Sequence, residues 1–199
     1  MEFKEIVRQR FACRKYEDTK IPDETIQELL EIIRYSVSAR NLQPWKVKVV
    51  SDRETLDELF GATGNQVQVK MCSHLLVLCA DTDYGTLIER MDKSLQAAGV
   101  PDDMRAQSIE AVKERVASYN PEQLLHWTQC QVFIALGNAV NGAFSLGLGA
   151  SPMTNFKPAE FARILGLPAN LTPTALVALG YCAENPGPKR RYPVSEILV

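Results

Sequence analysis

Two clusters of basic residues at opposite ends of the chain are the side chains best suited to bind an anion. The first has four cations between positions 8 and 15, and the second follows a proline: Arg8, Arg10, Arg14 and Lys15, then Lys189, Arg190 and Arg191. Alone, each cluster is typical of a solvated basic face or an exposed loop. Together they could hold one phosphate, because the planar arginine guanidinium matches phosphate geometry and each charge-assisted hydrogen bond contributes about 1.5–3 kcal/mol.

No other pattern of catalytic residues is as specific. The chain has no Walker loop, no G-x-S-x-G elbow and no zincin helix. Gly147-Leu148-Gly149 is not a dinucleotide-binding fingerprint, since it follows a predicted helix and lacks the third glycine. His74 and His126 have no identifiable nucleophile partner, so we interpret both as structural. Cys72, His74 and Cys79 lack the paired spacing typical of zinc sites, and no metal is expected.

The composition indicates one domain, residues 1–199, that acts on small molecules. The chain has 199 residues, 46% of them hydrophobic, which is enough for a substantial core. Its net charge is -2 and its pI is about 5.8, with both signs of charge interspersed. This charge pattern argues against nucleic acid or an anionic membrane surface as a partner.

Three features predict a soluble, cytoplasmic protein. The chain starts with charged residues where a signal peptide would be apolar, and no apolar run approaches about 20 residues. The cysteines are odd in number and scattered: Cys13, Cys72, Cys79, Cys130 and Cys182. That distribution argues against a secreted disulfide framework and favours a reducing compartment.

Hydrophobic periodicity predicts several helices and a few short strands. Apolar residues recur at helical spacing within 22–36, where a proline and two acidic residues mark the start of the helix. Short apolar runs rich in strand-forming residues predict strands at 46–50, 74–80 and 174–181. Between the last two strands, helical periodicity dominates, at 86–98, 102–118 and 121–146.

The long segment 121–146 has a broad apolar face interleaved with small residues, among them Gly137 and Gly142. A helix this apolar is predicted to be buried nearly all round, either at the centre of the domain or at a subunit interface. Interior glycines cost about 1 kcal/mol each relative to alanine, so a packing reason for them is expected.

Five stretches of the sequence occur in the order typical of one known family: "RFACRKY", "SARNLQPW", "NQVQVKMCSH", "QVFIALGNAVNGAFSLGLGASPMTNF" and "ALGYCAENPGPKRRYP". Over nearly its whole length the chain resembles the FMN-dependent nitroreductases. The resemblance implies an α+β fold in which helices wrap a mostly antiparallel central sheet. It also implies an intertwined homodimer, built on the long helix, with FMN bound across the subunit interface.

The resemblance assigns FMN contacts to five parts of the chain. Arg10 would face the phosphate and ribityl end, and Arg14 the pyrimidine edge, where its charge would stabilise the reduced ring. Residues 38–41 would reach the flavin held mainly by the other subunit, while Gln43-Pro44-Trp45 turns the chain into a strand and Trp45 anchors the core. The implied cofactor-binding residues are Arg10, Phe11, Ala12, Arg14, Ser38, Ala39, Asn41, Asn65, Gln68, Pro152, Met153, Thr154, Asn155, Lys189, Arg190 and Arg191, with 152–155 expected as a loop whose backbone N–H groups approach flavin N5 and O4.

The implied activity is a two-step oxidoreductase reaction. Hydride would pass from NADH or NADPH to flavin N5, and then to a nitroaromatic or quinone-like acceptor, with residues 92–119 covering the acceptor side. Ala12, Val37 and Thr154-Asn155 depart from the residues usual in the family, which leaves other functions open. The alternatives are a flavin-binding protein without nicotinamide turnover, serving as a store, sensor or subunit, or divergent chemistry such as dehalogenation or flavin breakdown.

Overall fold

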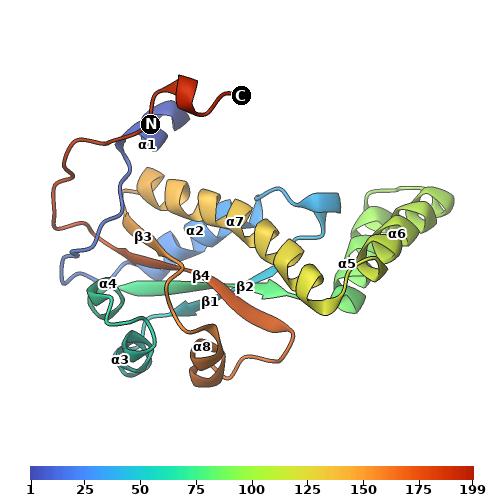
Figure 1. Ribbon diagram of the computed structural model, residues 1–199, viewed down its shortest axis with the longest axis horizontal. Helices are drawn as coiled ribbons and strands as arrows, with labels where there is room; N and C mark the ends of the chain where they lie inside the picture. Colours follow the sequence, from blue (N-terminus) through green and yellow to red (C-terminus); the bar gives the residue numbers. More distant parts are fainter.

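The computed structural model describes all 199 residues and has an antiparallel sheet of four strands at its centre (Figure 1). The strand order is β1-β2-β4-β3, with β1 at Trp45–Val50, β2 at His74–Asp81, β3 at Gly149–Met153 and β4 at Leu171–Gly180. The three predicted strands and the α+β class are confirmed. Strand β3 was not predicted, because it is short and contains Pro152. The strand lies at the sheet edge, where a proline is tolerated.

Helices cover both faces of the sheet. On one face lie α2 (Asp23–Arg34) and α7 (Pro121–Ser145); on the other lie α3 (Arg53–Gly61), α4 (Val67–Met71) and α8 (Pro158–Ile164). Along β2, Leu76 and Leu78 contribute to the first core cluster, while Leu75 and Val77 contribute to the second. This alternation is the two-residue period of a strand. All eight residues of β2 are buried, because helices cover the sheet on both sides.

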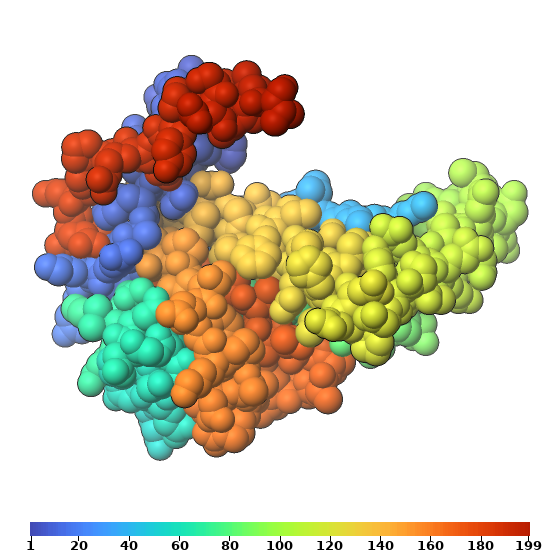
Figure 2. Space-filling view, viewed as in Figure 1, coloured from blue at the N-terminus to red at the C-terminus, as the bar shows by residue number.

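Two helices, α5 (Tyr84–Ala97) and α6 (Asp102–Ala117), extend away from the sheet at one end of the molecule (Figures 1 and 2). They pack around a separate small cluster formed by Leu42, Tyr84, Leu87, Met91 and Val112. Arg105 joins the two helices, since its guanidinium lies 2.8 Å from Asp92 of α5 and 2.7 Å from Asp102 of its own helix. The expected cover at 92–119 therefore corresponds mainly to this helical pair.

Helix α7 begins with a capping box, in which Asn120 and Gln123 exchange side chain-to-backbone hydrogen bonds. Within one chain the helix is not buried nearly all round, as the placement at the centre of the domain predicted, because Phe133 is 47% exposed and Ile134 is 40% exposed; the subunit-interface placement stays a prediction. The packing reason for a glycine is confirmed at Gly142, where a Cβ would lie 2.8 Å from Ile32 Cγ2 of α2. Gly137 instead faces open space.

The two chain ends lie side by side (Figures 1 and 2). Helix α1 (Phe3–Gln9) leads into an extended segment that pairs with the residues following β4, through Glu17 N–H to Tyr181 O at 2.9 Å and Ala183 N–H to Lys15 O at 2.9 Å. A short 3₁₀ helix, η2 (Val194–Glu196), ends the C-terminal segment. None of the helices is both long and apolar enough to span a membrane.

The paired ends are also joined covalently, by a disulfide between Cys13 and Cys182 with a Cα–Cα distance of 6.1 Å. The sequence argued only against a disulfide framework of the secreted type, and this single bond was not predicted. The two residues are 169 positions apart, so their spacing gave no indication that chain pairing would bring them together. Cys72, Cys79 and Cys130 remain free thiols.

Candidate active site

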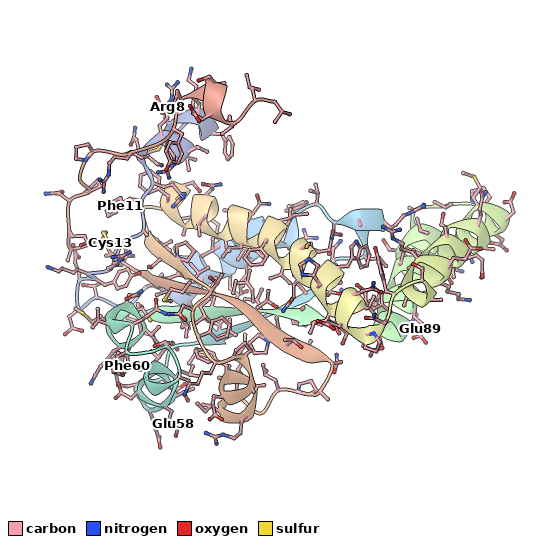
Figure 3. The ribbon with its side chains drawn as sticks, viewed as in Figure 1. Arg8, Phe11, Cys13, Glu58, Phe60 and Glu89 are labelled. Atoms are coloured by element: carbon pink, nitrogen blue, oxygen red, sulfur yellow. A yellow bond between two sulfur atoms is a disulfide. The ribbon has the colours of Figure 1, made fainter.

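The two basic clusters line one cavity of about 1080 Å³ between the ends of the chain. Figure 3 labels Arg8, Phe11 and Cys13 along the N-terminal side, where this segment runs beside the C-terminal segment. Six cations line the cavity, and no acidic side chain does: Arg8, Arg10, Arg14, Lys189, Arg190 and Arg191. The volume is about that of the largest common ligand pockets, roughly 1,000 Å³. Phe11, Ala12 and Pro152 of the predicted site lie in the same wall.

Backbone contacts hold the cations in place. Arg10 is the residue that ends α1, and the Lys189 ammonium donates a hydrogen bond to its carbonyl oxygen at 2.7 Å and another to the Val7 carbonyl. A cation at these positions satisfies carbonyl groups that a helix leaves unpaired at its C-terminus. Cys13 N–H donates to Ala150 O at 3.2 Å, which fixes the N-terminal segment against β3.

The electrostatics of the cavity favour an anionic ligand. Partial burial and the nearby Arg191 lower the pKa of Arg10. Burial, together with Arg10 and Arg191, lowers the pKa of Lys189. Burial contributes most to both pKa shifts and repulsion between the cations adds to it, and a bound phosphate would offset both effects. The residues present therefore fit a phosphate-bearing cofactor.

A second group of predicted residues, around Gln68 and Met153, lies next to the part of the cavity wall that Pro152 forms. Gln68 is buried, and its side-chain amide donates to Gln66 Oε1 at 3.1 Å and lies 3.2 Å from Met153 Sδ. Gln66 in turn donates to the carbonyl oxygen of Asn155 at 2.6 Å. These contacts join the segment that carries Gln68 to the end of β3. Gln66 was missed by the sequence reading, although it lies between the predicted Asn65 and Gln68.

The expected loop at 152–155 needs correction. Pro152 and Met153 belong to β3, where they pair with Val177 and Leu176 of β4, and only Thr154 and Asn155 lie beyond the strand. Asn65 is exposed and has a positive φ of 65°, an uncommon conformation for a residue with a side chain. It lies at the turn before α4.

The third predicted group, Ser38, Ala39 and Asn41, does not line this cavity. It lies at a 3₁₀ turn, η1 (Ala39–Asn41), where Ala39 N–H donates to Gln131 Oε1 of α7 at 2.9 Å. Phe144 lines the cationic cavity from the same helix, 13 residues further along. At 1.5 Å per residue, this places the two sites about 20 Å apart along the helix.

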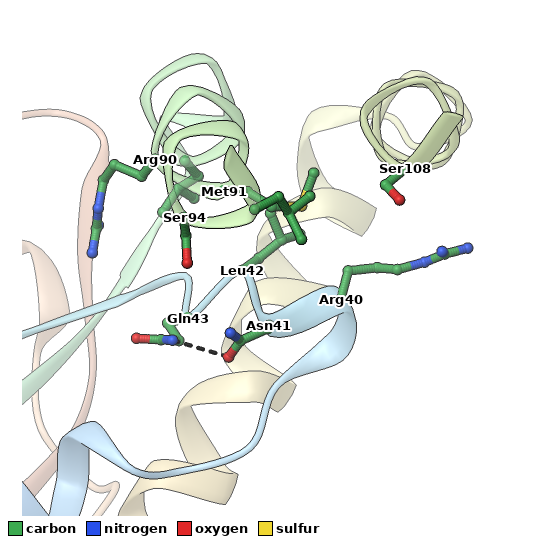
Figure 4. Close-up of a pocket in the computed structure, with 10 residues that line it drawn as sticks. Arg40, Asn41, Leu42, Gln43, Arg90, Met91, Ser94 and Ser108 are labelled. Atoms are coloured by element: carbon green, nitrogen blue, oxygen red, sulfur yellow. Dashed lines mark hydrogen bonds between the residues drawn. The ribbon is translucent and has the colours of Figure 1, made fainter. Parts of the chain in front are cut away.

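The backbone around η1 is strained. Arg40, Asn41 and Gln43 have positive φ angles of 55°, 53° and 48°. Two hydrogen bonds maintain the turn, both at 2.9 Å: Gln43 N–H donates to Ser38 Oγ, and Gln43 Nε2 donates to Asn41 Oδ1, the bond drawn in Figure 4. Strained positions of this kind cost about 1–3 kcal/mol each and often mark functional sites.

The same turn forms one side of a smaller cavity of about 310 Å³, whose other side comes from α5 and α6 (Figure 4). Its lining mixes polar and apolar side chains, including Arg40, Asn41, Gln43, Arg90 and Met91. Trp45, which follows the turn, is only 8% exposed and belongs to the main core, so its predicted anchoring role is confirmed.

Comparison with known proteins assigns the chain to a family. Residues 7–181 match the model of the nitroreductase family. A protein of Thermus thermophilus named NADH dehydrogenase is 33% identical over 190 residues, covering 96% of this chain and 91% of that protein. The chain therefore belongs to the nitroreductase family, and the predicted class of oxidoreductase is confirmed.

Solved structures show the same fold. A nitroreductase family protein from Streptococcus pneumoniae superimposes with a TM-score of 0.90 at 24% identity, over 100% of this chain and 99% of that chain. A structure from Exiguobacterium sibiricum, solved in complex with FMN, has a TM-score of 0.89 at 22% identity, over 100% of this chain and 97% of that chain.

Proposed function

We propose that this protein is an FMN-dependent oxidoreductase that takes reducing equivalents from NADH or NADPH and delivers them to a nitroaromatic or quinone-like acceptor. The observation that carries the proposal is the cavity lined by six cations from both ends of the chain, without an acidic side chain. The family membership supports it, as do the FMN found in a structure of the same fold and the name NADH dehydrogenase of a relative.

The residues divide into a phosphate end and a ring end. At the phosphate end, Arg10, Lys189 and Arg191 repel one another in the absence of an anion, and their charges would neutralise the phosphate. Arg190 lines the same cavity and is available for the same role. At the ring end, Arg14 and Pro152 line the wall nearest the buried Gln68, which we assign to the pyrimidine edge together with Asn65.

Bound FMN would supply the hydride chemistry, accepting hydride from the nicotinamide and passing it to the acceptor. This chain would supply binding, orientation and electrostatics. The guanidinium of Arg14 would stabilise negative charge that develops at the pyrimidine edge. Backbone N–H groups at Thr154 and Asn155 would orient the ring, since the Gln66 contact fixes the position of this segment.

We further propose that the site is completed by a second copy of the chain. Helix α7 exposes Phe133 and Ile134 beside the half-buried Gly137 on one face, although its other face is buried. The C-terminal segment also exposes apolar side chains, with Tyr192 86%, Ile197 76% and Leu198 69% exposed. Burying such surface would favour association. An antiparallel pairing of α7 with its symmetry mate would bring the η1 turn of one copy toward the cationic cavity of the other.

The test is an anaerobic titration of the purified protein, followed by flavin absorbance, with NADH and NADPH added separately. We expect a yellow protein that holds FMN and bleaches with at least one nicotinamide. A protein that stays colourless after incubation with FMN would contradict the flavin site. A yellow protein that bleaches with neither nicotinamide would support the alternative of flavin binding without nicotinamide turnover.

A further inference from the structure

The Cys13–Cys182 disulfide lies behind the wall of the cationic cavity, next to residues that line it. Cys13 lies between Ala12 and Arg14, which both line the cavity, and Cys182 precedes the C-terminal segment that carries the second basic cluster. Cys13 is fully buried, whereas Cys182 is partly exposed. The bond therefore joins the two segments that contribute cations to the cavity.

We propose that Cys13 and Cys182 form a reversible redox site that controls the affinity of the cavity for its phosphate-bearing cofactor, with the disulfide form binding more tightly. The inference rests on the proposed FMN site. It requires that the bond pre-organise the cations, and that a reductant reach it.

Pre-organisation follows from the charges. Six cations surround the cavity with no acidic side chain between them, so an empty cavity pushes the two chain ends apart. Backbone pairing of residues 15–17 with 181–183 holds the two segments together next to the disulfide, and beyond this pairing the contacts that oppose separation are few. Glu184 accepts hydrogen bonds from the backbone N–H groups of Arg14 at 2.5 Å and Lys15 at 3.3 Å, and Lys189 contacts the end of α1.

Between these contacts, residues 185–188 make no backbone hydrogen bond. The disulfide is the covalent link that keeps the base of this segment in place before the cofactor arrives. Without it, the cofactor must order the segment as it binds, and such ordering lowers affinity.

Close packing links the redox state of the disulfide to the position of the cavity wall. A Cβ on Gly149 of β3 would lie 2.9 Å from Cys13 Cβ and 3.0 Å from Cys182 Cβ, so the cysteine pair contacts the strand backbone closely. Three residues along the same strand, Pro152 lines the cavity. A displacement of either cysteine would therefore reach the wall through β3.

The exposed side of Cys182 gives a reductant access to the bond. The thiolate of an external dithiol attacks Cys182 Sγ, forms a mixed disulfide and releases the Cys13 thiolate, which takes up a proton. The second thiolate of the reductant then attacks the reductant sulfur of the mixed disulfide. This closes the disulfide of the reductant and releases the Cys182 thiolate, which is protonated in turn. Two electrons pass to the protein pair, and the reductant leaves as its disulfide. The reverse exchange with an oxidised dithiol closes the bond again.

The reduced pair would have acceptors for its thiol protons without rearrangement. The Lys15 carbonyl lies 3.1 Å from Cys13 Sγ, and the Glu184 carbonyl lies 3.6 Å from Cys182 Sγ. Reduction should therefore loosen the chain ends without unfolding the domain. Disulfides in reducing compartments, such as the one that the cysteine usage predicts, are typically transient and redox-sensing.

The test compares FMN affinity of the two redox forms, measured as quenching of FMN fluorescence by apoprotein before and after treatment with a phosphine reductant. Thiol titration of the denatured protein assigns each form, with three free thiols expected in the oxidised protein and five after reduction. We expect reduction to weaken binding about tenfold, because ordering one or two long cationic side chains costs roughly that factor.

Two variants separate this effect from general effects of the reductant. Cys182→Ser should bind FMN as weakly as the reduced protein and should not respond to the reductant. Cys79→Ala, which removes a free thiol of β2 that neither lines the cavity nor lies on the exposed face of α7, should bind FMN like the wild type in both forms.

Equal FMN affinity of the oxidised and reduced wild type would overturn the inference and leave the proposed function intact. Five free thiols in protein exposed to an oxidised dithiol would overturn it as well. If no form binds FMN, the proposed function fails, and this inference fails with it.

Discussion

Replacing Gly180 with alanine tests whether the close packing behind the cavity positions the N-terminal segment. Gly180 is the last residue of β4, and a Cβ there would lie 2.6, 2.7 and 2.9 Å from Tyr16 Cδ1, Cγ and Cβ. These atoms cannot move easily, because Tyr16 is 6% exposed and its hydroxyl is held by the carbonyl oxygens of Cys13 at 2.8 Å and Ala178 at 2.9 Å.

The expected cost has two parts. Overpacking a filled site typically costs about 1–3 kcal/mol. Displacing Tyr16 would also leave buried carbonyls without their donor, at about 1 kcal/mol or more. We expect Gly180→Ala to lower the free energy of unfolding by about 2–4 kcal/mol, which in a chain of this size lowers Tm by roughly 5–15 °C. Because Tyr16 is three residues from Cys13, FMN affinity should fall as well.

Urea unfolding of a double-mutant cycle measures this coupling. If the clash with the ring is the cause, Gly180→Ala should cost at least about 1 kcal/mol less in a Tyr16→Ala background than in the wild type. Gly61→Ala is the matched control, since nothing lies within 4 Å of its added Cβ, and as a helical Gly-to-Ala change in α3 it should leave the stability unchanged or raise it by up to about 1 kcal/mol. Equal cost of Gly180→Ala in both backgrounds, or no cost at all, would refute the reasoning.

Three further predictions concern the ring, the interface and pH. Arg14→Ala should slow flavin reduction about 10- to 100-fold in a stopped-flow assay while weakening FMN binding less in a fluorescence assay, because the charge of Arg14 matters most as the ring becomes anionic. Equal losses of reduction rate and FMN affinity would contradict that role. Phe133→Asp should yield a folded monomer in sedimentation experiments, whereas Met104→Asp, at a comparably exposed apolar side chain on α6, should not change the oligomeric state. Burial, with a smaller effect of Lys20, lowers the pKa of His74 from its usual value of 6.5, so the folded state resists protonation that the unfolded state accepts. Stability should therefore fall as pH drops below about 6.5, and His74→Asn should reduce this dependence in urea unfolding at pH 7.5 and 5.

The sequence predicted the elements whose pattern is set locally. Strand β2 was recognisable from its apolar run, and α2 and α7 from their helical periodicity. Strand β3 was not recognisable, because its residues Gly149–Met153 include no β-branched side chain, and its pairing with β4 depends on contacts far along the chain. The exposed apolar face of α7 was hidden for a related reason. Composition shows that a helix is apolar, but not which of its faces another element covers.

The candidate site shows the same division. Residue type alone marked the two basic clusters, but their convergence on one cavity depends on the pairing of residues 15–17 with 181–183. Gln66 carried no signal of its own, since its contact with Asn155 joins segments 89 positions apart. The disulfide could not be predicted either, because it also depends on the pairing of residues 15–17 with 181–183.

The separation of the η1 turn from the cationic cavity bears on why the site should need two chains. Residues 38–43 are held in a strained conformation by two hydrogen bonds within the turn and one to Gln131 of α7, and stored strain of this kind often marks a functional site. Within one chain the turn lines small cavities against neighbouring helices, and none of them is the cationic cavity. If a second copy places its turn over the cavity formed by the paired chain ends, two incomplete sites become one closed site. Disrupting the α7 face should then weaken cofactor binding about 20 Å away, in a chain whose own fold is intact.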